Sequence, residues 1–248
     1  MEDVLTETAP PSRFLEEDLD NFATPSPPLP HPFILLSPDP NPIPYLLLIA
    51  ISPPSLALLH RIPGKTLIGA LIVPETPLSG TALVPSPRDR SIDIYAVDNG
   101  KTVLVAVQYP IPAERAKAVA RAVVRGLTAE RVVVLDSIKR GNYRGRLTGD
   151  EAVGVKLETA EQRREGGGVA MEWMPEGSVV DGLGAAVMGE CQMRRIKGTL
   201  CVTWPDQGRP SVVPLLGTVM KGLGLDVDVD VAGVEGELGG GFDLDLYS

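Results

Sequence analysis

Short, uninterrupted apolar runs constrain this chain more than any other feature of its sequence. They have the length of strands, and the clearest are YLLLIAI (45–51), ERVVVLDS (130–137) and GTLCVTW (198–204). A strand that is apolar at nearly every position is buried on both faces of its sheet, as in parallel sheets that carry helices on both sides. The sequence therefore predicts an α/β fold.

Helical patterns separate these runs. The clearest is IPAERAKAVARAVVRGL (111–127), and a second is SVVDGLGAAVMGECQM (178–193), where Ser178 and Asp181 form a capping pair. Each pattern has apolar residues on one face, at helical spacing. They are Ala116, Val119, Ala120, Val123, Val124 and Leu127 in the first, and Val180, Leu183, Gly184, Val187, Met188 and Cys191 in the second. Shorter helices are expected after Ser52, as the N-cap, and over 210–223.

Further strands complete the expected sheet. TLIGALIV (66–73) has the character of a buried strand, while SIDIYAV (91–97) and KTVLVAV (101–107) flank Asp-Asn-Gly. Asn-Gly suits the positive φ angles of a tight turn and predicts a β-hairpin. We therefore expect a layered, largely parallel sheet with one antiparallel hairpin.

The two ends of the chain differ from its centre. Residues 1–44 hold eleven prolines and predict an extended arm, within which SRFLEEDLDNF (12–22) is either an amphipathic docking segment or disordered. Residues 45–222 form the expected α/β domain. Residues 223–248 form an expected flexible tail, because seven acidic residues and no lysine or arginine follow from Asp226 onward.

Charge and apolar content restrict the expected partners. The formal net charge is −9, which argues against nucleic acid and against an anionic membrane as the main partner. MEDVLTETAPPSR has no apolar secretory core, and the run 45–51 is too short to span a bilayer. We expect a reducing compartment, the cytoplasm and also the nucleus.

Few residues predict catalysis or metal binding. His31 and His60 have no second ligand or triad partner nearby in the sequence. Cys191 and Cys201 match no zinc or redox spacing and are expected to be small, buried hydrophobic residues.

Three other patterns have structural explanations. The glycines of DGLGAA (181–186) fall inside the expected helix, so close packing explains them better than phosphate binding does. The basic cluster IKRGNYRGR (138–146) is interpreted as a solvated loop or a protein contact. The P-x-x-P patterns of TPSPPLP (24–30) are common in linkers, although SH3-type domains also recognise them.

One region resembles a known family. VVDGLGAAVMGECQMRRIKGTLCVTWPD (179–206) resembles the signature region of the proteasome assembly chaperone 1 family, with Cys191-Gln192 followed by Ile196 and Leu200. MEDVLTE, IAISPPSLALLHR and ERVVVLDSI, in the same order, resemble its plant-type members. The resemblance covers most of residues 1–204, whereas 205–245 do not align.

The resemblance implies a function and a fold. Family members are not enzymes and need no cofactor. They pair with a related protein, proteasome assembly chaperone 2, and the heterodimer binds the α-subunit ring of the 20S proteasome during assembly. Their fold is a three-layer α/β/α sandwich, distantly similar to nucleoside phosphorylases. They end in a hydrophobic-tyrosine-any-residue motif that docks between α subunits, which Leu246, Tyr247 and Ser248 match.

Two other classes of function stay open. An enzyme or a nucleotide- or nucleoside-binding protein would need converging ionisable groups, for which Asp136, Asp181 and the arginines at 140, 144 and 146 are the candidates. A proline-rich adaptor would bind its partners through residues 24–32.

Overall fold

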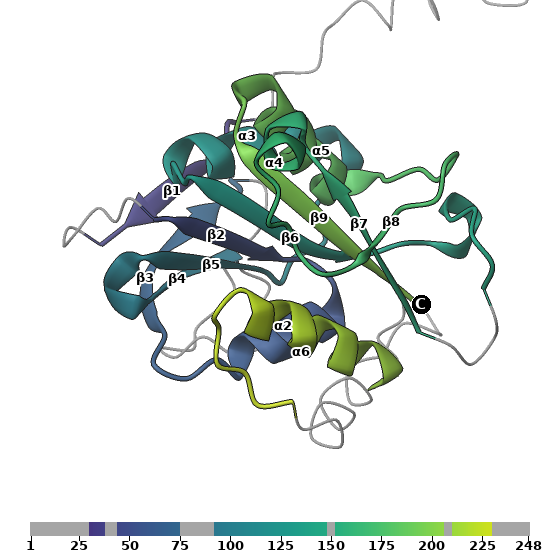
Figure 1. Ribbon diagram of the computed structural model, residues 1–248. Coiled ribbons are helices and arrows are strands. Elements are labelled where there is room, and N and C mark those ends of the chain that lie inside the picture. Colours follow the sequence, from purple (N-terminus) through teal and green to yellow (C-terminus); the bar gives the residue numbers. More distant parts are fainter. Residues whose placement is uncertain (1–29, 38–43, 75–91, 148–151, 206–209, 230–248) are drawn as a thin grey trace, which may run out of the picture. The chain divides into compact units, whose positions relative to one another are not determined.

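The computed structural model describes residues 30–37, 44–74, 92–147, 152–205 and 210–229. These residues form one mixed sheet between two layers of helices (Figure 1). The strands are β1 (Phe33–Leu36), β2 (Leu46–Ala50), β3 (Thr66–Ile72), β4 (Ile92–Val97), β5 (Thr102–Val107), β6 (Arg131–Ser137), β7 (Val153–Glu158), β8 (Glu172–Trp173) and β9 (Lys197–Trp204). The α-helices are α2 (Pro53–His60), α3 (Ala113–Gly126), α4 (Ala160–Glu165), α5 (Gly182–Arg194) and α6 (Val213–Gly222).

The sheet is parallel at its centre and antiparallel toward its edges. Its order is β1-β3-β4-β5-β2-β6-β9-β7-β8. Strands β5, β2, β6 and β9 run parallel to one another, whereas β4, β3 and β1 on one side and β7 on the other are joined by antiparallel pairs. The expected layered α/β fold with a mixed sheet is confirmed, and its parallel character lies at the centre.

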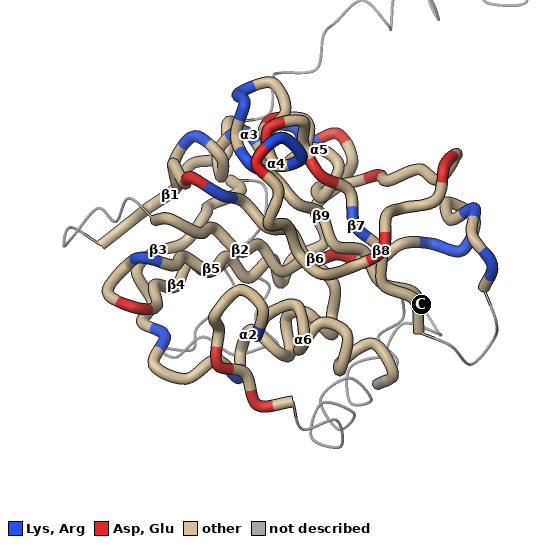
Figure 2. Tube along the Cα trace, viewed as in Figure 1, with Lys and Arg blue, Asp and Glu red and all other residues tan. Residues whose placement is uncertain are grey.

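Each face of the sheet has its own apolar core. Helices α3 and α5 cover one face, where Val123 and Val187 pack on Ile49 and Val134. Helices α2 and α6 cover the other face, where Leu58 and Leu216 pack on strands β2 and β6. Charged residues gather on α3, α4 and α5, while α2 and α6 carry few of them (Figure 2). No helix among the described residues is both long and apolar enough to cross a membrane.

Several local expectations are confirmed. Strands β4 and β5 form the hairpin expected around Asp-Asn-Gly, where Asp98, Asn99 and Gly100 have φ angles of 52°, 55° and 86°. All six residues expected on the inner face of α3 are buried. Cys191 and Cys201 are buried free thiols, and burial raises the pKa of each to about 12.

The expected boundaries of the α/β domain are too narrow at both ends. Phe33–Leu36, which we assigned to the proline-rich arm, pairs with β3 as an edge strand. Leu225 and Val227, which belong to the expected flexible tail, are buried in the apolar core on the α2 and α6 side of the sheet. Leu225, Val227 and Val229 alternate with Asp226 and Asp228, so the apolar side chains turn inward while the acids stay near solvent.

Two further expectations are wrong in detail. Strand β3 lies one position from the sheet edge, and only Leu71 within it is buried, because the described helices pack mainly on the central strands. Ser178 does not cap α5, since its hydroxyl accepts a hydrogen bond from the Arg144 amide at 3.0 Å. Asp181 is the N-cap residue of α5 by backbone position, without a side-chain capping bond.

Gly184 lets α5 approach the sheet closely. A Cβ atom at this position would lie 2.7 Å from Asp136 Oδ2 and 3.3 Å from Leu200 Cδ1. This contact explains a glycine in a helix, where it costs about 1 kcal/mol relative to alanine. The interpretation of Gly184 as a packing residue is therefore confirmed.

We expect Gly184→Ala to be less stable than the matched variant Gly189→Ala. Gly189 lies in the same helix, and a Cβ there would meet nothing within 4 Å. Gly189→Ala should raise the free energy of unfolding by up to about 1 kcal/mol through helix propensity. At Gly184 overpacking costs about 1–3 kcal/mol and cancels or reverses that gain. Denaturant unfolding of both variants measures the difference, and equal stabilisation would contradict the packing argument.

Candidate functional site

The central strands end together at a cleft of about 490 Å³, which we call the carboxyl-end cleft. It forms where β2, β5 and β6 end and α5 begins, the place where open α/β sheets commonly bind ligands. Its polar lining consists of Ser52, Gln108, Tyr109, Asp136, Ser137, Lys139 and Asp181.

Asp136 is the most perturbed ionisable group in this cleft. It lies near the end of β6, against the first turn of α5. Burial raises the pKa of its carboxyl to about 6, and the negative charge of Asp181 adds to the rise. The Ser137 amide, which donates a hydrogen bond to Asp136 Oδ1 at 2.8 Å, and the charge of Lys139 act in the opposite direction. Asp136 is thus suited to exchange a proton near pH 6.

Asp181 links α5 to the loop that follows β6. Its Oδ2 accepts a hydrogen bond from Asn142 Nδ2 at 3.1 Å and lies 3.7 Å from Lys139 Nζ. A backbone hydrogen bond also holds this loop, since the Val179 amide donates to the Asn142 carbonyl at 2.9 Å. The Asp181 and Lys139 side chains are 61% and 72% exposed, so this ion pair contributes little to stability.

The cleft brings together only part of the set that an enzyme was expected to need. Asp136 and Asp181 line it, but Arg140, Arg144 and Arg146 are exposed and do not. His60 lies at the end of α2, with its ring centroid 6.4 Å from that of Tyr95. No histidine or cysteine lines the cleft. Within the described part of the chain, no three His, Cys, Asp or Glu residues are grouped so as to hold a metal ion.

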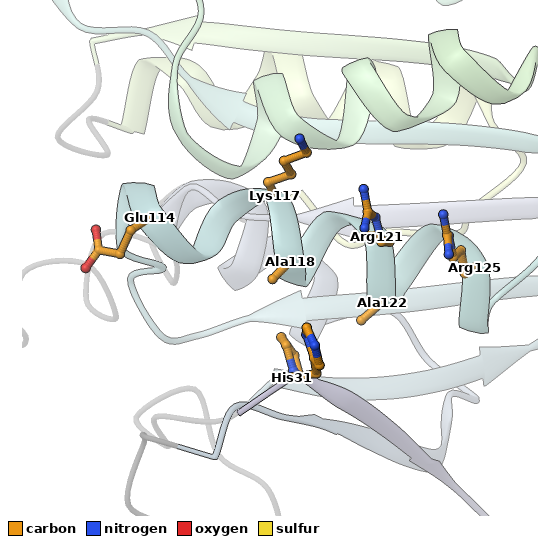
Figure 3. Close-up of a pocket in the computed structure, with 8 residues that line it drawn as sticks. His31, Glu114, Lys117, Ala118, Arg121, Ala122 and Arg125 are labelled. Atoms are coloured by element: carbon orange, nitrogen blue, oxygen red, sulfur yellow. The ribbon is translucent and has the colours of Figure 1, made fainter. Parts of the chain in front are cut away.

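A second hollow, which we call the α3 groove, runs along the outer face of α3. Its volume is also about 490 Å³. Figure 3 shows Lys117, Arg121 and Arg125 along one side of the helix, with Ala118 and Ala122 facing His31. Arg121 Nε lies 3.5 Å from Glu190 Oε1, so this arginine also ties α3 to α5. The groove is basic along most of its length and suits an acidic or polar protein segment.

Sequence reasoning missed the α3 groove, although the sequence contains a sign of it. Lys117, Arg121 and Arg125 recur every four residues within a helix that was correctly expected. Residues at this spacing share one helix face. His31 and Pro32, which also line the groove, come from the expected proline-rich arm, so their place beside α3 could not be predicted from the pattern.

The expected docking residues Leu246, Tyr247 and Ser248 lie outside the described residues. The amphipathic segment 12–22 also lies outside them, as do residues 24–29 of the proline-rich patterns.

The fold is similar to that of solved archaeal proteins. No protein-family model matches the chain, and no curated protein matches it in sequence. PbaA of Pyrococcus furiosus, described as an archaeal homologue of proteasome-assembly chaperone, has a TM-score of 0.60 at 18% identity, covering 84% of this chain and 92% of PbaA. PbaB of the same organism, described as an archaeal proteasome activator, has a TM-score of 0.61 at 15% identity, covering 85% and 95%. At these identities the comparisons establish the fold.

We expect Asp136→Asn to stabilise the protein at pH 7 and to flatten its pH dependence. The folded pKa of Asp136, about 6, exceeds its ordinary value of 3.8. Between about pH 4 and 6 the folded state therefore retains a proton that the unfolded state releases, and stability falls as pH rises. Removing this carboxylate should raise the free energy of unfolding at pH 7 by about 1–3 kcal/mol.

Denaturant unfolding from pH 4 to 7 measures this effect. Asp181→Asn serves as the control, because the Asp181 side chain is 61% exposed. Its removal should leave most of the pH dependence of the free energy of unfolding unchanged. If the free energy of unfolding of Asp136→Asn falls with pH as steeply as that of the wild type, Asp136 does not titrate in this range.

Proposed function

We propose that this protein is an assembly chaperone of the 20S proteasome that acts by binding rather than by catalysis. It pairs with a related chain, proteasome assembly chaperone 2, and the pair covers the α-subunit ring while the ring forms. The protein belongs to the plant-type branch of proteasome assembly chaperone 1 and works in the cytoplasm, with the nucleus as a second location.

The fold similarity to PbaA carries this proposal. It extends over 84% of this chain and 92% of PbaA, so nearly the whole domain is shared rather than a common βαβ unit. PbaB, with similar coverage, is described as a proteasome activator, which links a second protein of this fold to the proteasome.

The last three residues supply the docking element in this proposal. Leu246 and Tyr247 offer apolar area, and the tyrosine hydroxyl offers a directional hydrogen bond. The carboxylate of Ser248 meets a lysine in a pocket between neighbouring α subunits. Residues 230–248 hold five acidic residues and no basic ones, so the docking residues follow a stretch whose like charges repel one another.

A small-molecule site is the second candidate function. The observation in its favour is that Asp136, Asp181 and Lys139 line one cleft at the carboxyl ends of parallel strands. A thermal-shift screen with nucleosides and inorganic phosphate tests it. Stabilisation that Asp136→Asn and Asp181→Asn abolish would favour this function, and no shift at millimolar ligand would exclude those ligands.

We expect Tyr247→Ala to weaken binding to α rings or 20S particles by about thirtyfold or more. A buried aromatic anchor commonly contributes about 2 kcal/mol, which corresponds to that factor. Tyr247→Phe should lose less, because only the hydroxyl contact disappears. One residue added after Ser248 should be nearly as harmful as Tyr247→Ala, since it displaces the carboxylate.

The affinity of the wild type and of the three altered proteins for surface-immobilised 20S particles is the measurement. Circular dichroism and denaturant unfolding serve as controls, and neither should change, because the altered residues lie beyond the buried segment that ends near Val227. Equal affinity of all four proteins would reject the C-terminal residues as the docking element.

A further inference from the structure

A third, smaller hollow lies at the other end of β6 from the carboxyl-end cleft, and we call it the Arg131 pocket. Arg131 is the first residue of β6, and the other walls come from the loop that follows α4 and from the last turns of α6. The volume of the pocket is about 140 Å³, whereas pockets for drug-sized ligands commonly have about 300–1,000 Å³. The Arg131 pocket therefore suits a small ion or one end group of a ligand.

The Arg131 side chain brings N–H donors to this pocket that no described residue uses. Side chains alternate along a strand, so Arg131 lies on the same face of the sheet as Val133, the face that α6 covers. The Nε atom of Arg131 is buried and donates no hydrogen bond to a described residue, and no described carboxylate forms an ion pair with the guanidinium. A buried donor without an acceptor is costly and rare in folded proteins. Arg131 therefore calls for an acceptor that the described residues do not supply.

The glycine loop after α4 presents backbone donors to the same pocket. Gly166 and Gly167 have φ angles of 74° and 64°, a conformation that favours glycine. A Cβ atom at either position would meet nothing within 4 Å, so close packing does not account for these two glycines. The amides of residues 167–170, all of which line the pocket, donate no hydrogen bond within the described part of the chain. Successive amides in a turn conformation form concave sites for anions.

The charges around the pocket leave Arg131 without a counterion. None of the other described residues that line the pocket is charged. The carboxylates of Glu130 and Glu165 bind Lys197 Nζ at 2.8 and 2.6 Å. Both glutamate side chains are 55% exposed, so solvent and salt screen the negative charge that remains. The pocket itself is therefore positively charged.

The C-terminal end of α6 also faces the pocket. Helix C-termini carry a partial negative charge, which disfavours an anion. Here the Met220 carbonyl accepts hydrogen bonds from the amides of Leu223 and Leu225, both at 3.0 Å, and the Lys221 carbonyl accepts one from the Gly224 amide at 2.9 Å. Since these carbonyls are bonded to backbone donors, the full charge of Arg131 outweighs their partial charges.

We propose that the Arg131 pocket binds a phosphate group. The guanidinium holds phosphate oxygens bidentately from the strand, and the amides of residues 167–170 donate to the remaining oxygens from the loop. Donors that come from two elements suit a tetrahedral oxyanion better than a planar carboxylate. The pocket volume admits the phosphate group and leaves the rest of a larger ligand outside. This inference concerns the chain by itself and does not rest on the proposed function.

Titration of the isotope-labelled, full-length chain with inorganic phosphate tests the site by NMR, with potassium chloride keeping the ionic strength constant. The signals of the Arg131 Nε–H and of the Gly167, Gly168 and Ala170 amides should move together and give one Kd. Arg131→Met keeps an unbranched side chain but removes the charge. It should raise this Kd by about tenfold or more, because a charge-assisted bidentate contact is lost.

Arg125→Met is the matched control, because it removes the same charge from the basic α3 groove. It should leave the Kd for phosphate at the wild-type value, and circular dichroism should show that both variants are folded. Titration with AMP distinguishes two sources of the phosphate group: tighter binding of AMP assigns the pocket to a nucleotide, and weaker binding assigns it to the free ion. Loop signals that do not move at millimolar phosphate, or a Kd that Arg131→Met alters no more than Arg125→Met does, would overturn the proposal.

Discussion

The burial of β2 on both of its faces is the constraint on which the rest of the described structure depends. Each of its five side chains is at most 4% exposed. Leu47 and Ile49 point to one core, while Leu46 and Leu48 point to the other. Two layers of helices are therefore required, and neighbouring strands in the centre run parallel because helices connect them. Since these strands end at the same edge, the loops that follow them form the carboxyl-end cleft.

Much of this fold could be predicted from the sequence, because a single local pattern, either a helical periodicity or an apolar run, identified each of several helices and strands. The buried face of α3 and the hairpin around Asn99 are examples. Strand β1 could not be predicted, because its four residues lie in a proline-rich segment and are stabilised by pairing with residues of β3 that lie 33 to 39 positions further along the chain. The role of Leu225 and Val227 was hidden by the acids between them, although alternating apolar and polar residues are themselves a sign of a two-sided extended segment.

The candidate sites depend on tertiary structure to a greater extent. Asp136 and Asp181 were each named from the sequence, but only the packing of α5 against β6 brings them into one cleft. The raised pKa of Asp136 follows from burial, which local sequence does not report.

The net charge of the whole chain was a misleading guide to the charge of the folded domain. Residues 1–29 and 230–248 together hold twelve acidic residues and one basic residue, whereas residues 30–229 hold 20 acidic and 22 basic residues. The basic α3 groove therefore lies on a body that is not itself acidic.

The central claim is that this domain binds proteasome α subunits during their assembly. Purification of the chain from its own cells, with an affinity tag at the N-terminus and the C-terminus free, tests it most directly. The account predicts that α subunits of the 20S proteasome accompany the chain in stoichiometric amounts, together with a second chain of the same fold and without mature β subunits. Recovery of the chain without α subunits, under conditions in which assembling proteasomes are present, would contradict the account.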